Sequence, residues 1–468
     1  MRYISSRGSA PKLNFNEVLL TGLARDKGLY IPESWPEFSL REISSWRGLS
    51  YPELAEKIIK PFVGDCISDT VLKSLISSAY SSFNNSQIAP LNLLESGIWV
   101  MELFHGPTMS FKDIAMQFLG KTFDHVLQER EETITIIGAT SGDTGSAAIA
   151  ACSNKPSIEL FMLHPLGRIS EIQRRQMTTM LSSNIHNIAL IGTFDDCQDR
   201  VKDLFNDMLF RDRWHLSAVN SINWGRIMAQ IVYYFWGALK VGGPEIPVAF
   251  SIPTGNFGNI FAGYSAYRMG LPIANLITAS NQNDILTRFF ETGSMEITAV
   301  KPTISPSMDI QVSSNFERLL FELVGRDGSR VNRIMTQFRQ KGAFHLSNKL
   351  LNNAKELFGA ARFDDAATLE VMAQEHARSK TFFDPHSAIG LAAARKVDSK
   401  NNVPTIVLAT AHPAKFPEPV FSATGLKPKL PSMFKTLLKD PERFETIEND
   451  LIAIKKHIET VMEVSRAK

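Results

Sequence analysis

The sequence predicts an α/β protein with largely parallel sheets, and two observations favour that class. Short apolar runs rich in isoleucine, leucine and valine recur through the middle of the chain, and most are bounded by polar, glycine or proline residues. Amphipathic segments lie between these runs, and alternation of strand and helix is typical of parallel sheets. Because ligands bind at the carboxyl ends of parallel strands, the loops that follow the predicted strands become the candidate sites.

The individual elements follow from these patterns in chain order. The predicted strands span residues 98–104, 133–137, 158–163, 185–191, 247–252, 276–279 and 405–408. The predicted helices between them span residues 169–181, 195–209 and 224–239. Nearer the N-terminus, prolines punctuate helical patterns at 54–59 and 69–82, and apolar residues at helical spacing predict a packing helix within 440–464.

A chain of 468 residues is too long for one hydrophobic core, so we expect several domains. Residues 1–92 show little strand signal and are expected to form a small, mainly helical N-terminal domain.

The composition excludes several classes of function. Fifty Lys plus Arg against 48 Asp plus Glu leave a formal charge of +2, without the basic excess that a nucleic-acid binder needs. Cys66, Cys152 and Cys197 form no CxxC pair and no two histidines have HxxxH spacing, so we expect neither disulfides nor a metal site. No apolar run approaches the roughly 20 residues of a membrane helix, and no secretory signal is evident. We therefore expect a cytoplasmic protein.

Two glycine-rich loops have the features of anion-binding sites. Residues 253–259 (PTGNFGN) follow an apolar strand and precede a helix, where backbone amides can wrap a phosphate. They lack the P-loop and GxGxxG patterns, which argues against nucleotides, although a plain strand-to-helix turn is an alternative. Residues 138–145 (GATSGDTG) offer three hydroxyls among three glycines, which suits a carboxylate. The alternative is that Asp143 or Thr144 simply caps the helix.

A third loop places a lysine in apolar surroundings. Lys112 stands at a strand-to-helix junction with Phe104, Met109 and Phe111. An ordinary lysine has about one free amine in 2,500 at pH 7, so a nucleophilic lysine needs desolvation or imine formation. A surface helix lysine is the alternative. An imine-forming lysine, a phosphate loop and a second anion-binding loop are together what an aldehyde-phosphate cofactor and an amino-acid substrate require.

These motifs also resemble the threonine synthase family. The matching segments are SSRG (5–8), LARDKGLYIPE (23–33), HGPTMSFKD (105–113), ATSGDTGSAA (139–148), NSINWGR (220–226), PTGNFGN (253–259), DPHSAIG (384–390) and ATAHPAKF (409–416). The resemblance runs in the family's order from about residue 1 to residue 425. It implies a tryptophan-synthase-β-like, fold type II enzyme with two α/β domains and an N-terminal domain. The large α/β domain is expected to comprise residues 93–130 and 230–468, and the small one, residues 131–229, to close over the substrate.

The resemblance also implies a cofactor, pyridoxal 5'-phosphate, and the residues that bind it. Lys112 becomes the lysine that binds the cofactor covalently and shuttles protons, and Thr410 meets the pyridine nitrogen. Asp143 stands where related enzymes place an asparagine near the phenolic oxygen. The backbone amides that hold the cofactor phosphate become those of Gly255, Asn256, Phe257, Gly258 and Asn259.

The implied substrate is O-phospho-L-homoserine, which the family converts with water into L-threonine and phosphate. The implied ligands of its carboxylate are Thr140, Ser141 and Thr144, and those of its phosphate are Asn220, Ser221 and Arg226. Arg168 is a weaker second candidate for the phosphate, whereas Arg174 and Arg175 are expected on a solvated helix face. We expect His386 to be a structural, hydrogen-bonding residue.

Two other functions stay open at this point. A phospho-lyase that releases 2-oxobutyrate shares every step up to the departure of phosphate. A catalytically silent metabolite-binding protein is a different class, which the intact Lys112, Gly255 and Thr410 argue against. We expect a monomer rather than a homodimer, with no nucleic-acid or membrane partner.

Overall fold

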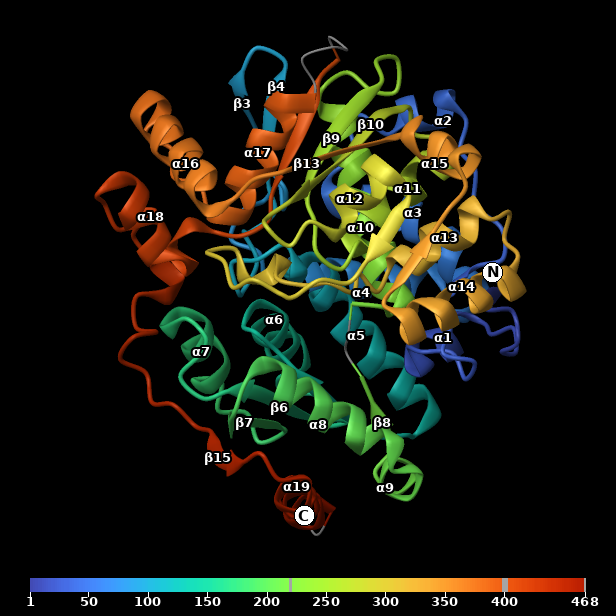
Figure 1. Cartoon of the computed structure of the whole chain (residues 1–468). Helices are drawn as coiled ribbons and strands as arrows, with labels where there is room; N and C mark the ends of the chain where they lie inside the picture. The colour runs from blue at the N-terminus through green and yellow to red at the C-terminus, as the bar shows by residue number, and fades with distance from the viewer. Residues whose placement is uncertain (219–220, 398–402, 467–468) are drawn as a thin grey trace. The chain divides into compact units, whose positions relative to one another are not determined.

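The computed structural model describes residues 1–218, 221–397 and 403–466, drawn in Figure 1. They divide into two compact units. Unit 1 comprises Met1–Ala115 and Ser221–Lys429, and unit 2 comprises Met116–Asn220 and Leu430–Lys468. The expected α/β architecture is present in each unit, because each is organised around one sheet whose strands are mostly parallel.

Unit 1 contains a six-stranded sheet in the order β13-β10-β9-β14-β4-β3. Its strands are β3 (Leu91–Glu95), β4 (Ile98–Glu102), β9 (Val248–Pro253), β10 (Ile273–Ser280), β13 (Phe358–Arg362) and β14 (Thr405–Ala409). All neighbours are parallel except the edge strand β3, which pairs with β4 in an antiparallel register. Val407 in the centre lies opposite Ser251 on one side and Val100 on the other.

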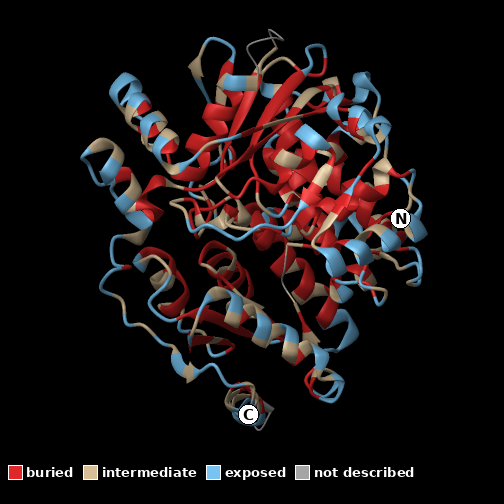
Figure 2. Cartoon of the chain, viewed as in Figure 1, coloured by how far each residue is buried: buried red, intermediate tan, exposed pale blue. Residues whose placement is uncertain are grey.

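Both central strands of this sheet are covered on their two faces. Every residue of β9 and β14 is buried, as the red strands of Figure 2 show, and their sequences are accordingly almost unbroken apolar runs. Helix α17 (Pro385–Val397) packs on β9, β10 and β14, and the Ser251 hydroxyl donates a 2.6 Å hydrogen bond to the Gly390 carbonyl. Helices α10 (Trp224–Lys240) and α11 (Gly258–Arg268) pack on each other.

The remainder of unit 1 is mainly helical, including its N-terminal part. A short antiparallel pair, β1 (Tyr3–Ser5) with β2 (Tyr30–Pro32), was not expected from the sequence, because three-residue strands give little pattern. The helices are α1 (Phe15–Thr21), α2 (Leu40–Ser45), α3 (Tyr51–Val63), α4 (Asp69–Tyr80), α12 (Ile285–Thr292), α13 (Phe316–Leu323), α14 (Gly328–Lys341), α15 (Asn348–Lys355), α16 (Asp365–Ser379) and α18 (Pro417–Thr424). Strands β11 (Ser294–Glu296) and β12 (Ala343–His345) form a separate antiparallel pair.

Unit 2 contains a wholly parallel five-stranded sheet in the order β15-β7-β6-β5-β8. The strands are β5 (Ile134–Ala139), β6 (Ile158–Pro165), β7 (Ile185–Ile191), β8 (Leu216–Ser217) and β15 (Glu445–Glu448). The helices are α6 (Asp143–Cys152), α7 (Glu171–Thr178), α8 (Phe194–Asn206), α9 (Met208–Arg213) and α19 (Leu451–Arg466), and α5 (Lys112–Arg130) carries the chain from unit 1 into unit 2.

The C-terminal segment differs from its predicted place. The sequence analysis put it in the large domain, whereas Leu430–Lys468 belongs to unit 2. Strand β15 extends the sheet beside β7, and Ile454 and Ile458 of α19 are buried in the same core as Phe161 and Leu204. The helix predicted within 440–464 begins only at Leu451, because the residues just before it pair as a strand.

Most other elements match the sequence patterns closely. Strand β7 has the predicted bounds, and the other predicted strands are present with ends shifted by a few residues. The single helix expected over 195–209 is two helices, because Asp207 caps α9 by accepting from the amide of Phe210 at 3.0 Å. Strand β13 was missed, since its sequence FGAAR has no run of large apolar residues.

The packing of α19 yields a direct test of the C-terminal segment. Ile458 is fully buried, so Ile458→Ala is expected to reduce the free energy of unfolding by roughly 2 to 5 kcal/mol. Ile452 on the same helix is 76% exposed, and Ile452→Ala should change stability by no more than about 0.5 kcal/mol. Urea unfolding followed by circular dichroism measures both. Equal losses would contradict the packing described here.

Candidate active site

Three neighbouring strands of unit 1 bring the predicted cofactor-binding segments together. Strands β4, β14 and β9 are adjacent and parallel, so their carboxyl ends lie at the same edge of the sheet. Thr410 follows β14, the 254–257 loop follows β9, and the segment leading to Lys112 follows β4. Since adjacent strands lie roughly 4.8 Å apart, three segments distant in sequence converge at this edge.

Lys112 is the first residue of α5 and is half-buried. Its backbone amide donates to the Ser110 hydroxyl at 3.2 Å, and its Nζ lies 4.9 Å from the centre of the Phe111 ring. The apolar setting expected around this lysine therefore includes one aromatic face. Met109, two residues earlier in the turn, has the left-handed φ of 59°.

The turn before Lys112 is fixed by a buried carboxylate. Asp113 accepts from the Thr108 amide at 2.8 Å and from the Thr108 hydroxyl at 2.7 Å, and Lys415 donates to the Thr108 carbonyl at 2.7 Å. Burial raises the pKa of Asp113 to about 6, against the opposing effect of these hydrogen bonds. A side chain at Gly106 would lie 2.4 Å from the Asp113 Cβ, which explains the glycine.

Thr410 is held beside this turn through its backbone. Its carbonyl accepts from the Phe111 amide at 2.8 Å, and its own amide donates to the Ser387 hydroxyl at 3.1 Å. Ser387 in turn donates to the buried carboxylate of Asp384, which also contacts His386 Nδ1 at 2.7 Å. The DPHS motif thus braces Thr410, with His386 in a hydrogen-bonding role.

In the 254–259 loop, side chains of a neighbouring segment bond the backbone carbonyls and leave the backbone amides available. The Ser313 hydroxyl donates to the Gly255 carbonyl at 2.7 Å. The backbone amide and side-chain Nδ2 of Asn315 donate to the Asn256 carbonyl at 3.1 and 3.0 Å. No described residue accepts from the amides of Gly255, Asn256 or Phe257. Phe257 adopts a left-handed φ of 61° at the start of α11, which turns the chain into the helix.

Asn259 adds a buried donor to the same loop. Its Oδ1 accepts from the hydroxyls of Tyr233 and Tyr234, at 2.5 and 2.9 Å. This fixes the amide so that Nδ2 is the free end, and Nδ2 is buried without a partner among the described residues. A buried unpaired donor is costly, so the residues present fit an anionic group such as a phosphate at this loop.

Arg226 is a second unsatisfied donor in unit 1. The side chain is buried, and neither Nε nor Nη1 has a partner among the described residues. Burial lowers the pKa of Arg226 to about 10, so the guanidinium stays charged at neutral pH. By contrast, the buried Arg318 donates to the carbonyls of Tyr30 and Ile222. A buried, unpaired cation fits an anionic ligand.

Arg226 lies near the glycine-rich loop. A Cβ at Gly258 would lie 3.4 Å from the Cδ1 of Ile227, the residue after Arg226. Asn315 bridges the same two segments, since its Nδ2 also donates to the Ser221 carbonyl at 3.1 Å. Asn220, the remaining predicted phosphate ligand, lies outside the described residues.

Unit 2 contains the predicted carboxylate-binding loop, after β5. The Thr140 hydroxyl oxygen accepts from the amides of Gly142 and Gly145, at 2.9 and 2.8 Å. Asp143 is buried at the first position of α6, and Ser141 and Thr144 are half-buried. The N-cap of α6 is Gly142, so the alternative that Asp143 or Thr144 caps this helix is wrong.

The arginines of unit 2 behave differently from one another. Arg168 is exposed in the turn after β6, with no side-chain partner among the described residues. Arg174 and Arg175 are not on a solvated face as expected. Arg174 Nε lies 2.8 Å from Glu442, and Arg175 lies 3.4 Å from the same carboxylate. The sequence pattern missed this contact because Glu442 is remote in the chain.

Several supporting residues could not be found from the sequence. Ser313 and Asn315 stand in an ordinary polar loop, and Tyr233 and Tyr234 look like core residues of an apolar helix. Gln173, whose amide donates to Asp143 at 2.8 Å, stood in a helix pattern with no separate signal. The described residues contain no group of three or more histidine, cysteine, aspartate or glutamate side chains suited to a metal ion. They also contain no helix long and apolar enough to cross a membrane.

A half-buried histidine, His412, makes stability depend on pH. Burial, and secondarily the charge of His105, lowers the pKa of His412 to about 4, against about 6.5 for an unfolded histidine. As pH falls from 6.5 towards 4, this histidine becomes protonated in the unfolded chain but stays neutral in the folded one. The free energy of unfolding therefore falls by up to roughly 3 kcal/mol.

The variant His412→Asn removes this titration while keeping an acceptor for the Ala414 amide, which now donates to Nδ1 at 3.1 Å. Urea unfolding between pH 7 and 4.5 should give a shallower loss of stability for the variant. Identical pH dependence in the two proteins would contradict the assignment.

Comparison with known families accounts for most of the chain. Residues 2–80 match the model for the threonine synthase N terminus, and residues 84–336 match pyridoxal-phosphate dependent enzymes. Residues 387–458 match the C-terminal model of threonine synthases.

Individual relatives agree over nearly the full length. A threonine synthase of Pseudomonas aeruginosa is 50% identical, with 98% of each chain covered. The crystal structure of a PLP-bound threonine synthase from Brucella melitensis superimposes with a TM-score of 0.96 at 47% identity, covering 98% of this chain and 99% of the other. The yeast threonine synthase gives a TM-score of 0.94 at 38% identity, with 99% of each chain covered. These findings confirm the expected fold type and the expected cofactor, pyridoxal 5'-phosphate, and the chain belongs to the threonine synthase family of pyridoxal-phosphate-dependent enzymes.

Proposed function

We propose that this enzyme converts O-phospho-L-homoserine and water into L-threonine and phosphate, the last step of threonine biosynthesis. The observation that carries the proposal is Arg226, a buried cation whose Nε and Nη1 have no partner among the described residues. The amides of Gly255–Phe257 and Nδ2 of Asn259 already suit the phosphate of the cofactor, so a separate cation nearby suits a substrate that has a phosphate of its own.

The cofactor-binding roles are those that the family resemblance implies, and the same geometry supports them. Lys112 would bind the cofactor aldehyde, the loop amides and Asn259 would hold its phosphate, and Thr410 would meet its pyridine nitrogen. When bound, the cofactor supplies an electron sink for the carbons next to the substrate amine. Thr410 brings a neutral hydroxyl that cannot keep the pyridine nitrogen protonated by charge, and the bonds from Phe111 and to Ser387 fix its backbone.

Lys112 is the group that moves protons. Its Nζ takes the proton from Cα of the substrate, and a second proton is lost from Cβ before phosphate leaves Cγ. Cγ is then protonated to the methyl group, water adds at Cβ and gives up a proton, and Lys112 is placed to return a proton to Cα. The hydrogen bonds between Thr108 and Asp113 fix the turn before Lys112 and so restrict where its amine can lie. Correct positioning of a reacting group contributes a large share of enzymatic rate enhancement.

The substrate-binding roles divide between its two anionic groups. Arg226, with Ser221 and Asn220, is proposed to bind the substrate phosphate. Thr140, Ser141 and Thr144 are proposed to bind the carboxylate. Asp143 is proposed to lie beside the phenolic oxygen of the cofactor. Arg168 is retained as a second phosphate ligand, although its exposed position supports it less than burial supports Arg226.

Other properties remain proposals from the sequence. A cytoplasmic location is consistent with three cysteines that are all free. A monomer is proposed over a homodimer, and light scattering of the purified protein measures the mass directly.

The variant Lys112→Ala is expected to abolish threonine formation, because both the cofactor link and the proton shuttle are lost. Mass spectrometry of the carbon product, together with phosphate release, measures this. Lys121→Ala, on the same helix, is the matched control and should retain activity. Phosphate accompanied by 2-oxobutyrate in the unaltered enzyme would favour the lyase, and bound cofactor without phosphate release would favour a silent binding protein.

The variant Arg226→Met is expected to raise KM for O-phospho-L-homoserine by roughly 10- to 100-fold, the worth of one charge-assisted hydrogen bond. Cofactor affinity should change little, which titration of the cofactor-free protein checks. Arg168→Met serves as the comparison and should have the smaller effect. An unchanged KM in Arg226→Met would remove this arginine from the substrate site.

A further inference from the structure

The carboxylate of Asp143 accepts a hydrogen bond from a neighbouring helix of unit 2. Nε2 of Gln173 on α7 donates to Asp143 Oδ1 at 2.8 Å, and both side chains are buried. The Ser170 hydroxyl donates to Gln173 Oε1 at 3.0 Å, so the oxygen end of the amide faces Ser170 and the nitrogen end faces Asp143. Ser170 also caps α7 by accepting from the Gln173 amide at 3.3 Å.

Gln173 also fits closely against the loop before Asp143. A Cβ at Gly142 would lie 2.4 Å from Gln173 Cδ, and Gly142 has a φ of 138° that other residues rarely adopt. The glycine therefore lets the buried glutamine pack directly on the loop backbone. The position of α7 consequently sets the position of both the loop and its carboxylate.

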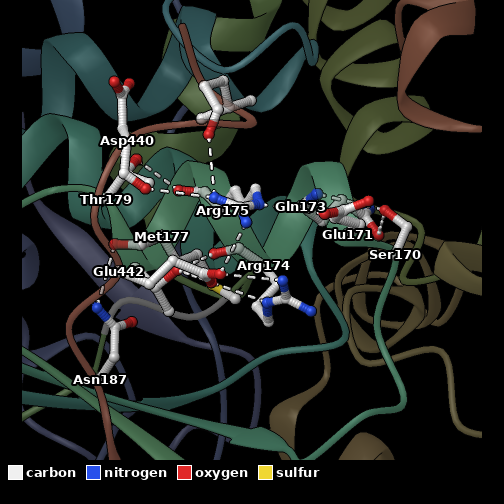
Figure 3. Close-up of polar contacts among 12 residues, drawn as sticks. Ser170, Glu171, Gln173, Arg174, Arg175, Met177, Thr179, Asn187, Asp440 and Glu442 are labelled. Atoms are coloured by element: carbon white, nitrogen blue, oxygen red, sulfur yellow. Dashed lines mark hydrogen bonds and ion pairs between the residues drawn. The ribbon is translucent and has the colours of Figure 1, made fainter.

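The C-terminal segment contacts three other side chains of α7, and Figure 3 labels two of them, Arg174 and Arg175, beside Glu442. Arg174 donates to both oxygens of Glu442, at 2.8 and 3.0 Å, and Arg175 Nη1 donates to the carbonyls of Leu437 and Asp440. The Thr178 hydroxyl donates to the same glutamate at 2.7 Å. The hydrogen bond from Arg174 lowers the pKa of Glu442, which keeps the pair ionised at neutral pH.

We propose that Gln173 is the positioning residue for Asp143, and that Glu442 holds in place the helix that carries Gln173. The proposal rests on the proposed function, in which Asp143 lies beside the cofactor. The C-terminal segment would then affect the reaction, because Glu442 holds α7 and Gln173 on α7 contacts the loop that contains Asp143. All the groups concerned belong to unit 2.

A purely structural role makes a different prediction. A hydrogen bond with only a structural role contributes to stability and would not affect the bound cofactor. A positioning role instead acts through Asp143, so the effect of altering Gln173 should vanish when Asp143 has already been altered.

The test compares Gln173→Met, Asp143→Ala and the double variant, using the absorbance spectrum of the bound cofactor, the Kd for cofactor of the cofactor-free protein, kcat and KM. Gln173→Met keeps the side-chain length and removes the donor. We expect kcat to fall by about 10- to 100-fold with KM changed far less, together with a shifted spectrum. The double variant should match Asp143→Ala. Ser170→Ala removes the hydrogen bond to Gln173 Oε1 and should shift the same readouts by a smaller amount. It provides the test if Gln173→Met fails to fold.

The tail is tested by Glu442→Gln against Glu171→Gln. Glu171 belongs to α7 itself and also pairs with Arg175, at 3.2 Å, but its side chain is exposed. Glu442→Gln should shift the cofactor spectrum in the direction of Gln173→Met, and Glu171→Gln should leave it unchanged. Equal spectra for both glutamate variants would overturn the role of the C-terminal segment.

Failure of this inference is distinguishable from failure of the proposed function. If Asp143→Ala leaves the spectrum, Kd and kcat unaltered, the proposed place of Asp143 is wrong. If Asp143→Ala is strongly impaired while Gln173→Met and Ser170→Ala change only thermal stability, or if the effects of Gln173→Met and Asp143→Ala simply add, the positioning role is overturned.

Discussion

The parallel pairing of β4, β14 and β9 is the constraint on which the candidate site of unit 1 depends. Because the three strands are adjacent and point the same way, the segments after them meet at one edge. Every residue of β9 and β14 is buried, and these two strands form the centre of the sheet. Sheet pairing thereby brings together Lys112, the Thr410 hydroxyl and the 254–259 loop, which are far apart in the sequence.

Supporting residues that are not themselves proposed ligands orient the polar groups at that edge. Ser313 and Asn315 hold the loop carbonyls, two tyrosines orient Asn259, and Asp384 braces Thr410 through Ser387. In the loop, these contacts bond the backbone carbonyls and leave the amides available for a ligand. At Asn259 they bond Oδ1 and leave Nδ2 available. The unpaired donors of Asn259 and Arg226 would be costly in a protein that bound nothing. They are what an enzyme handling two phosphates needs.

The sequence predicted most strands of the two larger sheets, and the places of the three loops and of Lys112 after them, because their signals are local. Apolar runs mark strands, and glycine with hydroxyl residues marks the turns after them. Supporting residues such as Asn315, Tyr234 and Gln173 were not predicted, since each acts on a partner remote in the chain. For the same reason the C-terminal segment was assigned to the wrong domain, and Arg174 was expected in solvent although it pairs with Glu442.

The reaction itself is tested most directly by running it in water enriched in oxygen-18. The account predicts that the Cγ–oxygen bond of O-phospho-L-homoserine breaks and that water adds at Cβ. Threonine should therefore carry one heavy oxygen in its hydroxyl, and the released phosphate, in equal amount, should carry none. Labelled phosphate with homoserine, or 2-oxobutyrate in place of threonine, would contradict the account.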